Sequence, residues 1–274
     1  MTTVSELHSE LVISAARDGP RAAPLSCATA VLFSARSPAR ETPNEDAALL
    51  VELPFGGIVV AVADGCGGMP GGSEAAAAAV RAIHDSARLA ESGEQLTGAI
   101  IAGFDAANRA IMDLRVGAGA TLSVVEIQDG ILRPYHAGDS MILLTGQRGR
   151  RKLQTIAHGP VSYAVEAGML TEDEAMLHAD RSLISNMVGS EEMRVDIGPP
   201  VALAPRDTLV VASDGLSDNV YASEIVEAVR AGPLAAAAER LVGLSEQRMA
   251  EPAGEGVGAP GHPDDLTFVL LRQG

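Results

Sequence analysis

The order of its predicted elements constrains the fold of this chain more than any other feature. Short aliphatic or β-branched runs bounded by Pro, Gly, Asn and Asp indicate strands. A pair of helical segments follows the first strands, more strands come next, and a second pair of helices precedes one last strand. Elements grouped in this way favour antiparallel sheets covered by pairs of helices over alternating β-α crossovers.

The predicted elements cover most of the chain after residue 26. The helices span 71–90, 93–114, 222–230 and 234–250, with a shorter helical piece at 171–177. The strands span 27–33, 47–53, 57–63, 120–127, 131–136, 141–145, 152–156, 194–197, 208–212 and 266–271. Asp129-Gly130 predicts a tight hairpin turn between the strands at 120–127 and 131–136.

Two segments do not fit this regular order. Residues 1–23 contain an amphipathic stretch that we interpret as a loosely docked N-terminal helix, an extension before a single domain at 24–274; its apolar residues are Leu7, Leu11, Val12 and Ala15. Residues 158–192 mix Gly, Pro and short helical pieces without a regular period. Long excursions of this kind in compact domains are usually functional.

Composition excludes several classes of protein. The chain of 274 residues is 47% hydrophobic, enough for a sizeable core, and its formal charge is 20 − 36 = −16. A chain with this negative charge has no general electrostatic attraction for nucleic acid or anionic lipid. Carboxylates that lie close together can, however, bind cations. Two cysteines are too few for a disulfide framework. Residues 1–20 lack the pattern of a signal peptide, and no apolar run approaches the roughly 20 residues of a membrane span. We therefore expect a cytoplasmic protein with no membrane or nucleic-acid partner.

Acidic residues cluster where apolar strands begin or end. Asp64 and Asp214 each end a buried run and enter a glycine; the others are Glu45-Asp46, Asp139 and Asp264-Asp265. Each site alone is typical of an ordinary turn. Divalent cations, however, need oxygen ligands from several carboxylates and backbone carbonyls, and an adjacent glycine lets the carbonyl approach the ion. The recurrence of the pattern therefore predicts a site for divalent cations.

Rival motifs are absent. Pro70 stands where a dinucleotide-binding loop needs its third glycine, and no Gly-Lys pair forms a phosphate-binding loop. Cys66 is followed six positions later by Gly72 rather than by the arginine of a thiol phosphatase. No His-x-x-x-His pair indicates a zinc-protease helix.

Taken together, six short motifs resemble, in order, those of the PPM-type (type 2C) metal-dependent protein serine/threonine phosphatases, in a bacterial-like form. They are Asn44-Glu45-Asp46, Asp64-Gly65-Cys66-Gly67-Gly68, Gly119-Ala120-Thr121-Leu122, Gly138-Asp139-Ser140, Ser213-Asp214-Gly215-Leu216 and Asp264-Asp265-Leu266-Thr267. The resemblance runs from about residue 27 to 272. It implies an α+β fold, a four-layer α-β-β-α sandwich of two antiparallel sheets flanked by helix pairs, with a Mg²⁺ or Mn²⁺ cluster at one end.

The resemblance also implies a set of metal ligands. Asp64 would bridge two ions, the Gly65 carbonyl would bind one of them, and Asp214 and Asp264 would complete the second site. Asp139 matches the residue that holds a third, weaker ion in bacterial relatives. In that chemistry the metals lower the pKa of a bridging water, orient it in line with phosphorus and neutralise the phosphoryl oxygens, with no covalent enzyme intermediate.

The catalytic assignments carried over from the family are less complete. Glu45 and Asp46 match a pair that binds a metal or its waters; which one touches the ion stays open, and Asp46 is assigned as catalytic as well as metal-binding. Arg40 is the candidate phosphate clamp, because a planar guanidinium suits bidentate contact. It stands one residue further from Glu45 than expected, so Arg36 remains a competitor.

The chain also departs from the family pattern. Met141 replaces a basic residue, and the segment at 158–192, which the family makes a flap beside the metals, begins Ala157-His158-Gly159 where relatives often carry Asp-His-Ser. Cys66 occupies a position where some relatives carry a histidine proposed as general acid, so no acid is assigned.

The leading hypothesis is an active phosphatase acting on phosphoserine and phosphothreonine in signalling proteins, with a cognate kinase, two Mn²⁺ or Mg²⁺ ions and a third at Asp139. A catalytically weak member acting as a regulatory binding module and a phosphohydrolase of small phosphoesters are the alternatives. We expect the flap to select the substrate.

Overall fold

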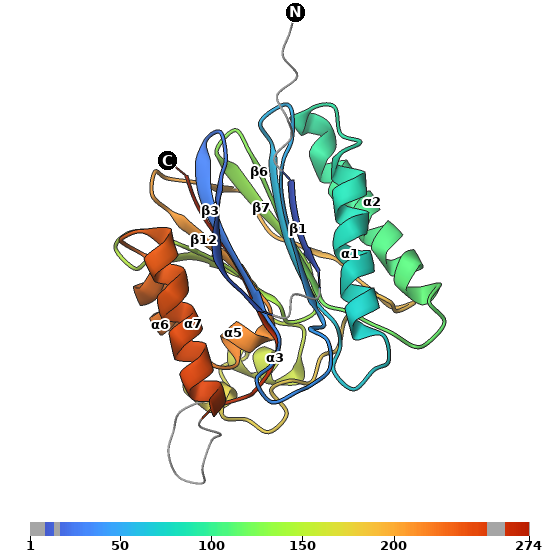
Figure 1. Ribbon diagram of the computed structural model, residues 1–274, viewed down its shortest axis with the longest axis vertical. Helices are drawn as coiled ribbons and strands as arrows, with labels where there is room; N and C mark the ends of the chain where they lie inside the picture. Colours follow the sequence, from blue (N-terminus) through green and yellow to red (C-terminus); the bar gives the residue numbers. More distant parts are fainter. Residues whose placement is uncertain (1–8, 14–16, 251–260, 274) are drawn as a thin grey trace, which may run out of the picture.

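Two antiparallel sheets pack face to face in the computed structural model, which describes residues 9–13, 17–250 and 261–273 (Figure 1). The first sheet has the order β1 (Ser9–Ile13), β4 (Asp46–Glu52), β5 (Ile58–Asp64), β6 (Leu122–Gln128), β7 (Ile131–Ala137) and β10 (Asp196–Ile197), and β11 (Val201–Ala202) also pairs with β7. The second has the order β2 (Arg17–Pro24), β3 (Ala28–Ala35), β13 (Leu266–Gln273), β12 (Thr208–Ala212), β8 (Met141–Thr145) and β9 (Arg151–Gln154).

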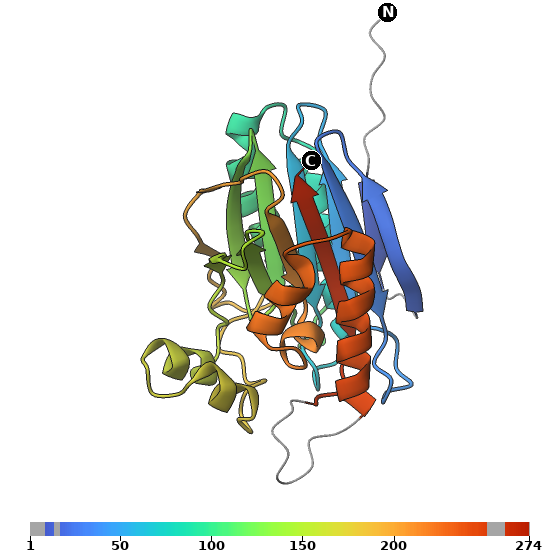
Figure 2. The same ribbon diagram turned by 90° about the vertical axis from the view of Figure 1, so that its left-hand side faces the viewer.

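Helix pairs cover the two outer faces. The pair α1 (Gly72–Ala87) and α2 (Gly93–Met112) lies on the first sheet, and α6 (Ala222–Val229) and α7 (Leu234–Ala250) lie on the second (Figure 1). Three shorter helices complete the described chain: α3 (Pro160–Glu166), α4 (Glu172–Met176) and α5 (Asp214–Ser217). Figure 2 shows α3 and α4 in a lobe that projects beside the sandwich. The predicted four-layer α+β sandwich is confirmed.

The core consists of three apolar layers, one between the sheets and one under each helix pair. Successive side chains of a strand point to opposite faces, so Leu49 packs under α1 and α2 while Leu50 packs between the sheets. On β12, Val210 packs under α6 and α7, and Val211 packs between the sheets. Burial on both faces explains why these strands are continuous apolar runs rather than alternating ones.

The predicted N-terminal helix is wrong. Ser9–Ile13 forms β1, which pairs with β4, and Arg17–Pro24 forms β2, which pairs with β3. Both become outer strands, because the edges of β3 and β4 would otherwise leave backbone groups unpaired. Two residues of the amphipathic stretch, Leu7 and Ala15, lie outside the described residues.

Most of the other predicted elements are found within a few residues of their expected bounds. The hairpin turn is confirmed, since Asp129 and Gly130 both have positive φ, 51° and 72°, as a type I′ turn requires. The short helices α3 and α5 were not predicted, while α4 is the expected helical piece, and Thr171 and Glu174 form its capping box. No helix within the described ranges combines the length and hydrophobicity of a membrane crossing.

Antiparallel pairing brings the acidic strand ends together. The start of β4 lies beside the end of β5, so that Asp46 and Asp64 are direct partners across the ladder. On the second sheet the end of β12 lies between the starts of β8 and β13. The turn that contains Asp139 joins the end of β7 to the start of β8 and so links the two sheets at this end.

Neighbouring isoleucines of α2 test the packing. Ile100 is fully buried in the layer under α1 and α2, whereas Ile101 is 36% exposed. We expect Ile100→Ala to lower the free energy of unfolding in a urea titration by about 2–5 kcal/mol, because it removes buried methyl groups and leaves a cavity. Ile101→Ala, the matched control, should change it by about 0.5 kcal/mol or less. Equal losses would contradict this arrangement of the core.

Candidate metal centre

The strand-end carboxylates line one cavity of about 100 Å³. Of the residues predicted from the sequence, it is bordered by Arg40, Glu45, Asp64, Gly65, Asp139, Asp214 and Asp264. Asp46 does not border it but lies buried close by, where its Oδ2 accepts a hydrogen bond from the Ser213 hydroxyl at 2.8 Å. The structure therefore brings the predicted site residues together.

Burial and mutual repulsion raise the pKa values of these carboxyl groups. Burial, and then the charge of Asp265, raises the pKa of Asp46 to about 8. Burial, and then the charge of Asp218, raises the pKa of Asp139 to about 7. Asp64 and Asp214 lie beside each other with little solvent access, and the pKa values of both lie well above the ordinary range. Ionised together, these groups need a compensating cation.

The donor set fits a hard divalent cation. Oδ1 of Asp46 and Oδ1 of Asp214 are buried and have no hydrogen-bond partner. Unsatisfied carboxylate oxygens are costly in a protein interior unless an ion binds them. A cavity lined by several carboxylates and bordered by a glycine suits Mg²⁺ or Mn²⁺ better than metals that prefer thiolate or imidazole.

Gly65 is required by the close approach of α1. A side chain at this position would collide with the backbone of Gly72, the first residue of that helix. At Gly72 in turn, a Cβ atom would lie 2.6 Å from Oε1 of Glu45. The two glycines thus allow the start of α1, the end of β5 and the Glu45 side chain to share one corner of the cavity.

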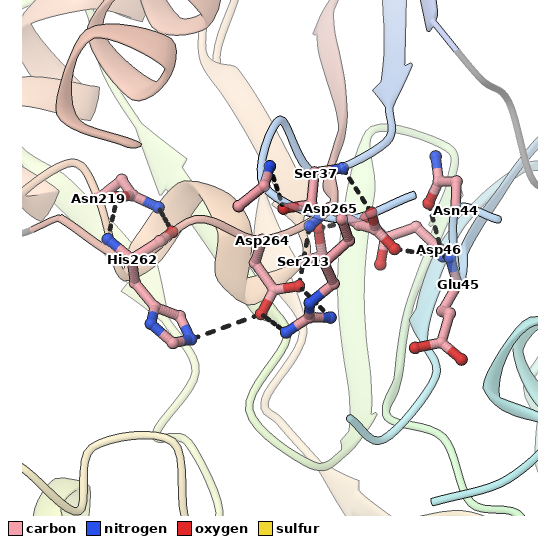
Figure 3. A network of polar contacts seen from close by, with 11 residues as sticks. Ser37, Asn44, Glu45, Asp46, Ser213, Asn219, His262, Asp264 and Asp265 are labelled. Carbon is pink, nitrogen blue, oxygen red and sulfur yellow. Dashed lines mark hydrogen bonds and ion pairs between the residues drawn. The ribbon is translucent and has the colours of Figure 1, made fainter. Parts of the chain in front are cut away.

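The consecutive aspartates before β13 have different surroundings (Figure 3). Asp265 accepts hydrogen bonds from the backbone amides of Ser37 and Glu45, both at 2.6 Å, and so anchors the segment before β4. Asp264 instead forms an ion pair with Arg40 at 3.1 Å, and His262 lies 3.5 Å away. Burial raises the pKa of Asp264, but the hydrogen bond from His262 and the charge of Arg40 outweigh burial and leave it below the ordinary value.

Of the two arginine candidates, only Arg40 borders the cavity. Its guanidinium is partly exposed and held by Asp264, whereas Arg36 donates a hydrogen bond to the Glu41 carbonyl at 3.2 Å. The geometry therefore favours Arg40.

Sequence reasoning missed Asp218. It follows α5 directly, and its charge acts on the pKa values of both Asp139 and Asp214. Oδ2 of Asp218 is buried, and the nearest cation is Arg181, whose Nε lies 3.3 Å away. The signal was present, because Asp214 and Asp218 are four residues apart and so lie on one face of a helical turn.

Cys66 borders the cavity with a neutral thiol. Burial, and then the charges of Asp139 and Asp214, raises its pKa to about 12. Its sulfur lies 3.6 Å from that of Met187. A thiol with such a pKa is not a nucleophile at neutral pH, in agreement with the absence of a thiol-phosphatase motif.

His158 joins the flap to the Asp139 turn. Its Nδ1 accepts a hydrogen bond from the amide of Gly138, and its own amide donates to the Gly138 carbonyl, both at 3.0 Å. Its Nε2 lies 3.0 Å from Oδ2 of Asp196, so β10 supplies an acidic partner that the sequence does not provide at position 157. His136, His158 and Asp196 lie close enough together to be considered as a second metal site. The rings of His136 and His158 are stacked, however, with an interplanar angle of 12° and centroids 4.5 Å apart, so one ion cannot lie in the planes of both rings.

Comparison with known proteins gives this site its context. Residues 33–250 match the family model described as protein phosphatase 2C. The chain belongs to the protein phosphatase 2C family. It is 38% identical over 129 residues to protein phosphatase PhpP of Streptococcus pneumoniae, a match that covers 46% of this chain and 51% of PhpP. It is 31% identical over 225 residues to serine/threonine protein phosphatase PstP of Mycobacterium tuberculosis, which covers 78% of this chain and 40% of PstP.

These matches span about half, or less, of the length of the curated relatives. The fold agrees over a longer range with a solved structure of the catalytic domain of PstP in complex with two manganese ions. The TM-score is 0.70 at 26% identity, and the match covers 90% of this chain and 98% of the solved one. The family and the fold that the six motifs implied are therefore confirmed.

The raised pKa values predict how stability depends on pH without metal. In the folded protein, Asp46 and Asp139 have pKa values of about 8 and about 7, whereas the ordinary pKa of an aspartate, which applies in the unfolded chain, is 3.8. Between these values the folded protein keeps protons that the unfolded chain has released. The unfolded state then binds fewer protons, so stability falls as pH rises. Burial lowers the pKa of His136 from 6.5, so this residue makes stability rise with pH, but only below about pH 6.5. In EDTA, the thermal midpoint should therefore fall between pH 6.5 and about 8.5.

Mn²⁺ should reverse this loss, raising the midpoint more at the higher pH because protons no longer compete for the oxygens. Asp46→Asn should make the fall in EDTA shallower, because one of the raised carboxyls is gone, while Asp105→Asn, on an exposed part of α2, should keep the wild-type profile. A midpoint in EDTA that is constant or rises over this range would contradict the electrostatic description of the site.

Proposed function

We propose that this protein hydrolyses phosphoserine and phosphothreonine on proteins, using Mn²⁺ or Mg²⁺ held by the carboxylate cluster. The observation that carries the proposal is one cavity lined by several carboxylates, among them the unpartnered Oδ1 of Asp214, with Arg40 at its border. Membership of the protein phosphatase 2C family supports it, as does the resemblance to a phosphatase domain that binds two manganese ions.

In this proposal, Asp64, the Gly65 carbonyl, Asp214 and Asp264 hold two ions, with Glu45 and Asp46 beside them. Asp139 holds a third ion. When bound, the ions supply an activated water nucleophile and neutralise charge on the phosphoryl oxygens.

The protein's own groups bind and orient the substrate. Arg40, held in the cavity wall by Asp264, presents a guanidinium fork to the phosphate. Asp265 fixes the backbone of Ser37 and Glu45 and so keeps the loop that carries Arg40 in register with β4. A protein substrate is far larger than a cavity of about 100 Å³, so the rest of it lies outside, against the flap at 158–192.

The complete carboxylate set gives no support to a binding-only role or to a preference for small phosphoesters. We further propose that the flap selects the substrate, that residues 24–274 act as one phosphatase domain together with the outer strands β1 and β2, and that the protein works in the cytoplasm opposite a protein kinase.

Hydrolysis of a phosphothreonine peptide tests the proposal. We expect hydrolysis with Mn²⁺ or Mg²⁺ and none in excess EDTA. Asp64→Asn and Asp214→Asn should each lower kcat/KM by at least ~10³, because each removes a charged ligand from the ions that stabilise the transition state. Asp105→Asn, exposed on α2, is the matched control and should keep wild-type activity. Full activity in EDTA would refute the metal-dependent mechanism.

Asp139 separates the third ion from the other two. We expect calorimetric titration of Asp139→Ala with Mn²⁺ to show two tight sites, as in the wild type, while turnover falls. The physical reason is that the side chains of Asp64, Asp214 and Asp264 remain in place around the main cavity. Loss of a tight site in this variant would instead assign Asp139 to the main cluster.

A further inference from the structure

A larger cavity, of about 370 Å³, opens beside the carboxylate cluster, between the flap helices and the sandwich. Its apolar wall includes Met141, Ile156, Val161, Val165, Met176 and Ile225. Asp139 and Asp214 border both this cavity and the smaller one that holds the carboxylate cluster. The two cavities therefore meet at these carboxylates.

Ion pairs fasten the flap on two sides of the larger cavity. Arg151 of β9 contacts Glu172 of α4 at 2.8 Å, and Arg181, which follows α4, contacts Asp218 at 3.3 Å. Both arginines that border the cavity are thus already paired with carboxylates. The remaining charged groups on its lining are acidic: Asp139, Asp214 and Glu166. An anionic guest would find no unpaired cationic side chain among the described residues of this lining, and an apolar guest would be buried.

We propose that this cavity is a side-chain subsite for protein substrates, which takes a large aliphatic or methionine side chain one or two residues from the phosphorylated residue. The inference rests on the proposed phosphatase function. A phosphate bound at the carboxylate cluster places neighbouring residues at Asp139 and Asp214, where the larger cavity begins. Its volume lies within the range of pockets that bury a ligand, and burial of an apolar side chain there is favourable.

The same lining discriminates against acidic neighbours. An aspartate or glutamate at the position that enters the cavity would leave water for an apolar wall whose two arginines are already paired with carboxylates. The subsite therefore selects protein substrates by an apolar residue and rejects those with an acidic one, while the phosphate is held elsewhere.

A peptide panel tests the subsite. The peptides are identical phosphothreonine sequences with Leu, Ala or Asp at one of the positions −2, −1, +1 or +2. With saturating Mn²⁺, the wild-type protein should show a kcat/KM about tenfold higher for Leu than for Ala at one or more positions, with Asp below Ala there.

Variants that fill the cavity should remove the preference. Ala175→Leu on α4 and Ser162→Leu on α3 add bulk from two different helices that line it. At the preferred position, each should bring the Leu-to-Ala ratio close to one. Ala167→Leu, the same change at an exposed position that does not line the cavity, should keep the wild-type ratio. Both peptides of each ratio are measured on the same preparation. A smaller fraction of active protein then lowers both kcat/KM values equally and leaves the ratio unchanged.

Two results would overturn the subsite alone: wild-type Leu-to-Ala ratios within twofold at all four positions, or an unchanged preference in both filled variants. Hydrolysis of p-nitrophenyl phosphate by the wild-type protein separates these from failure of the proposed function. Absence of Mn²⁺-dependent hydrolysis of both the aryl phosphate and the peptides would overturn the phosphatase proposal, and the subsite with it.

Discussion

Repulsion among closely spaced carboxylates, most of them largely withdrawn from water, is the constraint on which this site depends. Antiparallel strands from two sheets begin or end at the same edge of the sandwich, and this places both Asp46 and Asp214 beside Asp64. Without cations, these carboxyl groups keep their protons up to pH values well above the ordinary pKa of an aspartate. Once ionised, they need cations to balance their charge. The cluster is therefore favourable with bound cations and unfavourable without them. The neighbouring glycines and Asp265 arrange the backbone around it, and Arg40 lies at its border.

The rest of the fold supplies the stability that such a cluster requires. Three apolar layers bury β5, which ends at Asp64, and β12, which precedes Asp214. Neither strand can shift its register without moving core side chains into the wrong layer. By contrast, the flap helices are held by ion pairs and a few apolar contacts, and they border the cavity that we assign to substrate side chains. A rigid carboxylate cluster beside a more weakly anchored flap suits an enzyme that carries out one reaction on different protein substrates.

Local sequence patterns were sufficient for the strands, the helix pairs and the acidic strand ends, because each depends on neighbours within a few residues. Long-range contacts decided the rest. Residues 9–13 form a strand because β4 offers an unpaired edge almost 40 positions away, and Asp196 becomes the partner of His158 only through the pairing of β10 with β7. The choice of Arg40 over Arg36 needed the position of Asp264. Asp218 was detectable from its spacing to Asp214, but one turn of helix gives little periodicity to recognise. The metal-binding and catalytic roles of all these residues stay predictions.

The position of the bound ions tests the central claim most directly. Crystals grown with Mn²⁺ and measured at the manganese absorption edge should show two strong anomalous peaks in the cavity bordered by Asp64, Asp214 and Asp264. A weaker third peak is expected beside Asp139. Well-ordered carboxylates with no anomalous peak in that cavity would contradict the account, because the cluster would then be a set of protonated acids and not a metal centre.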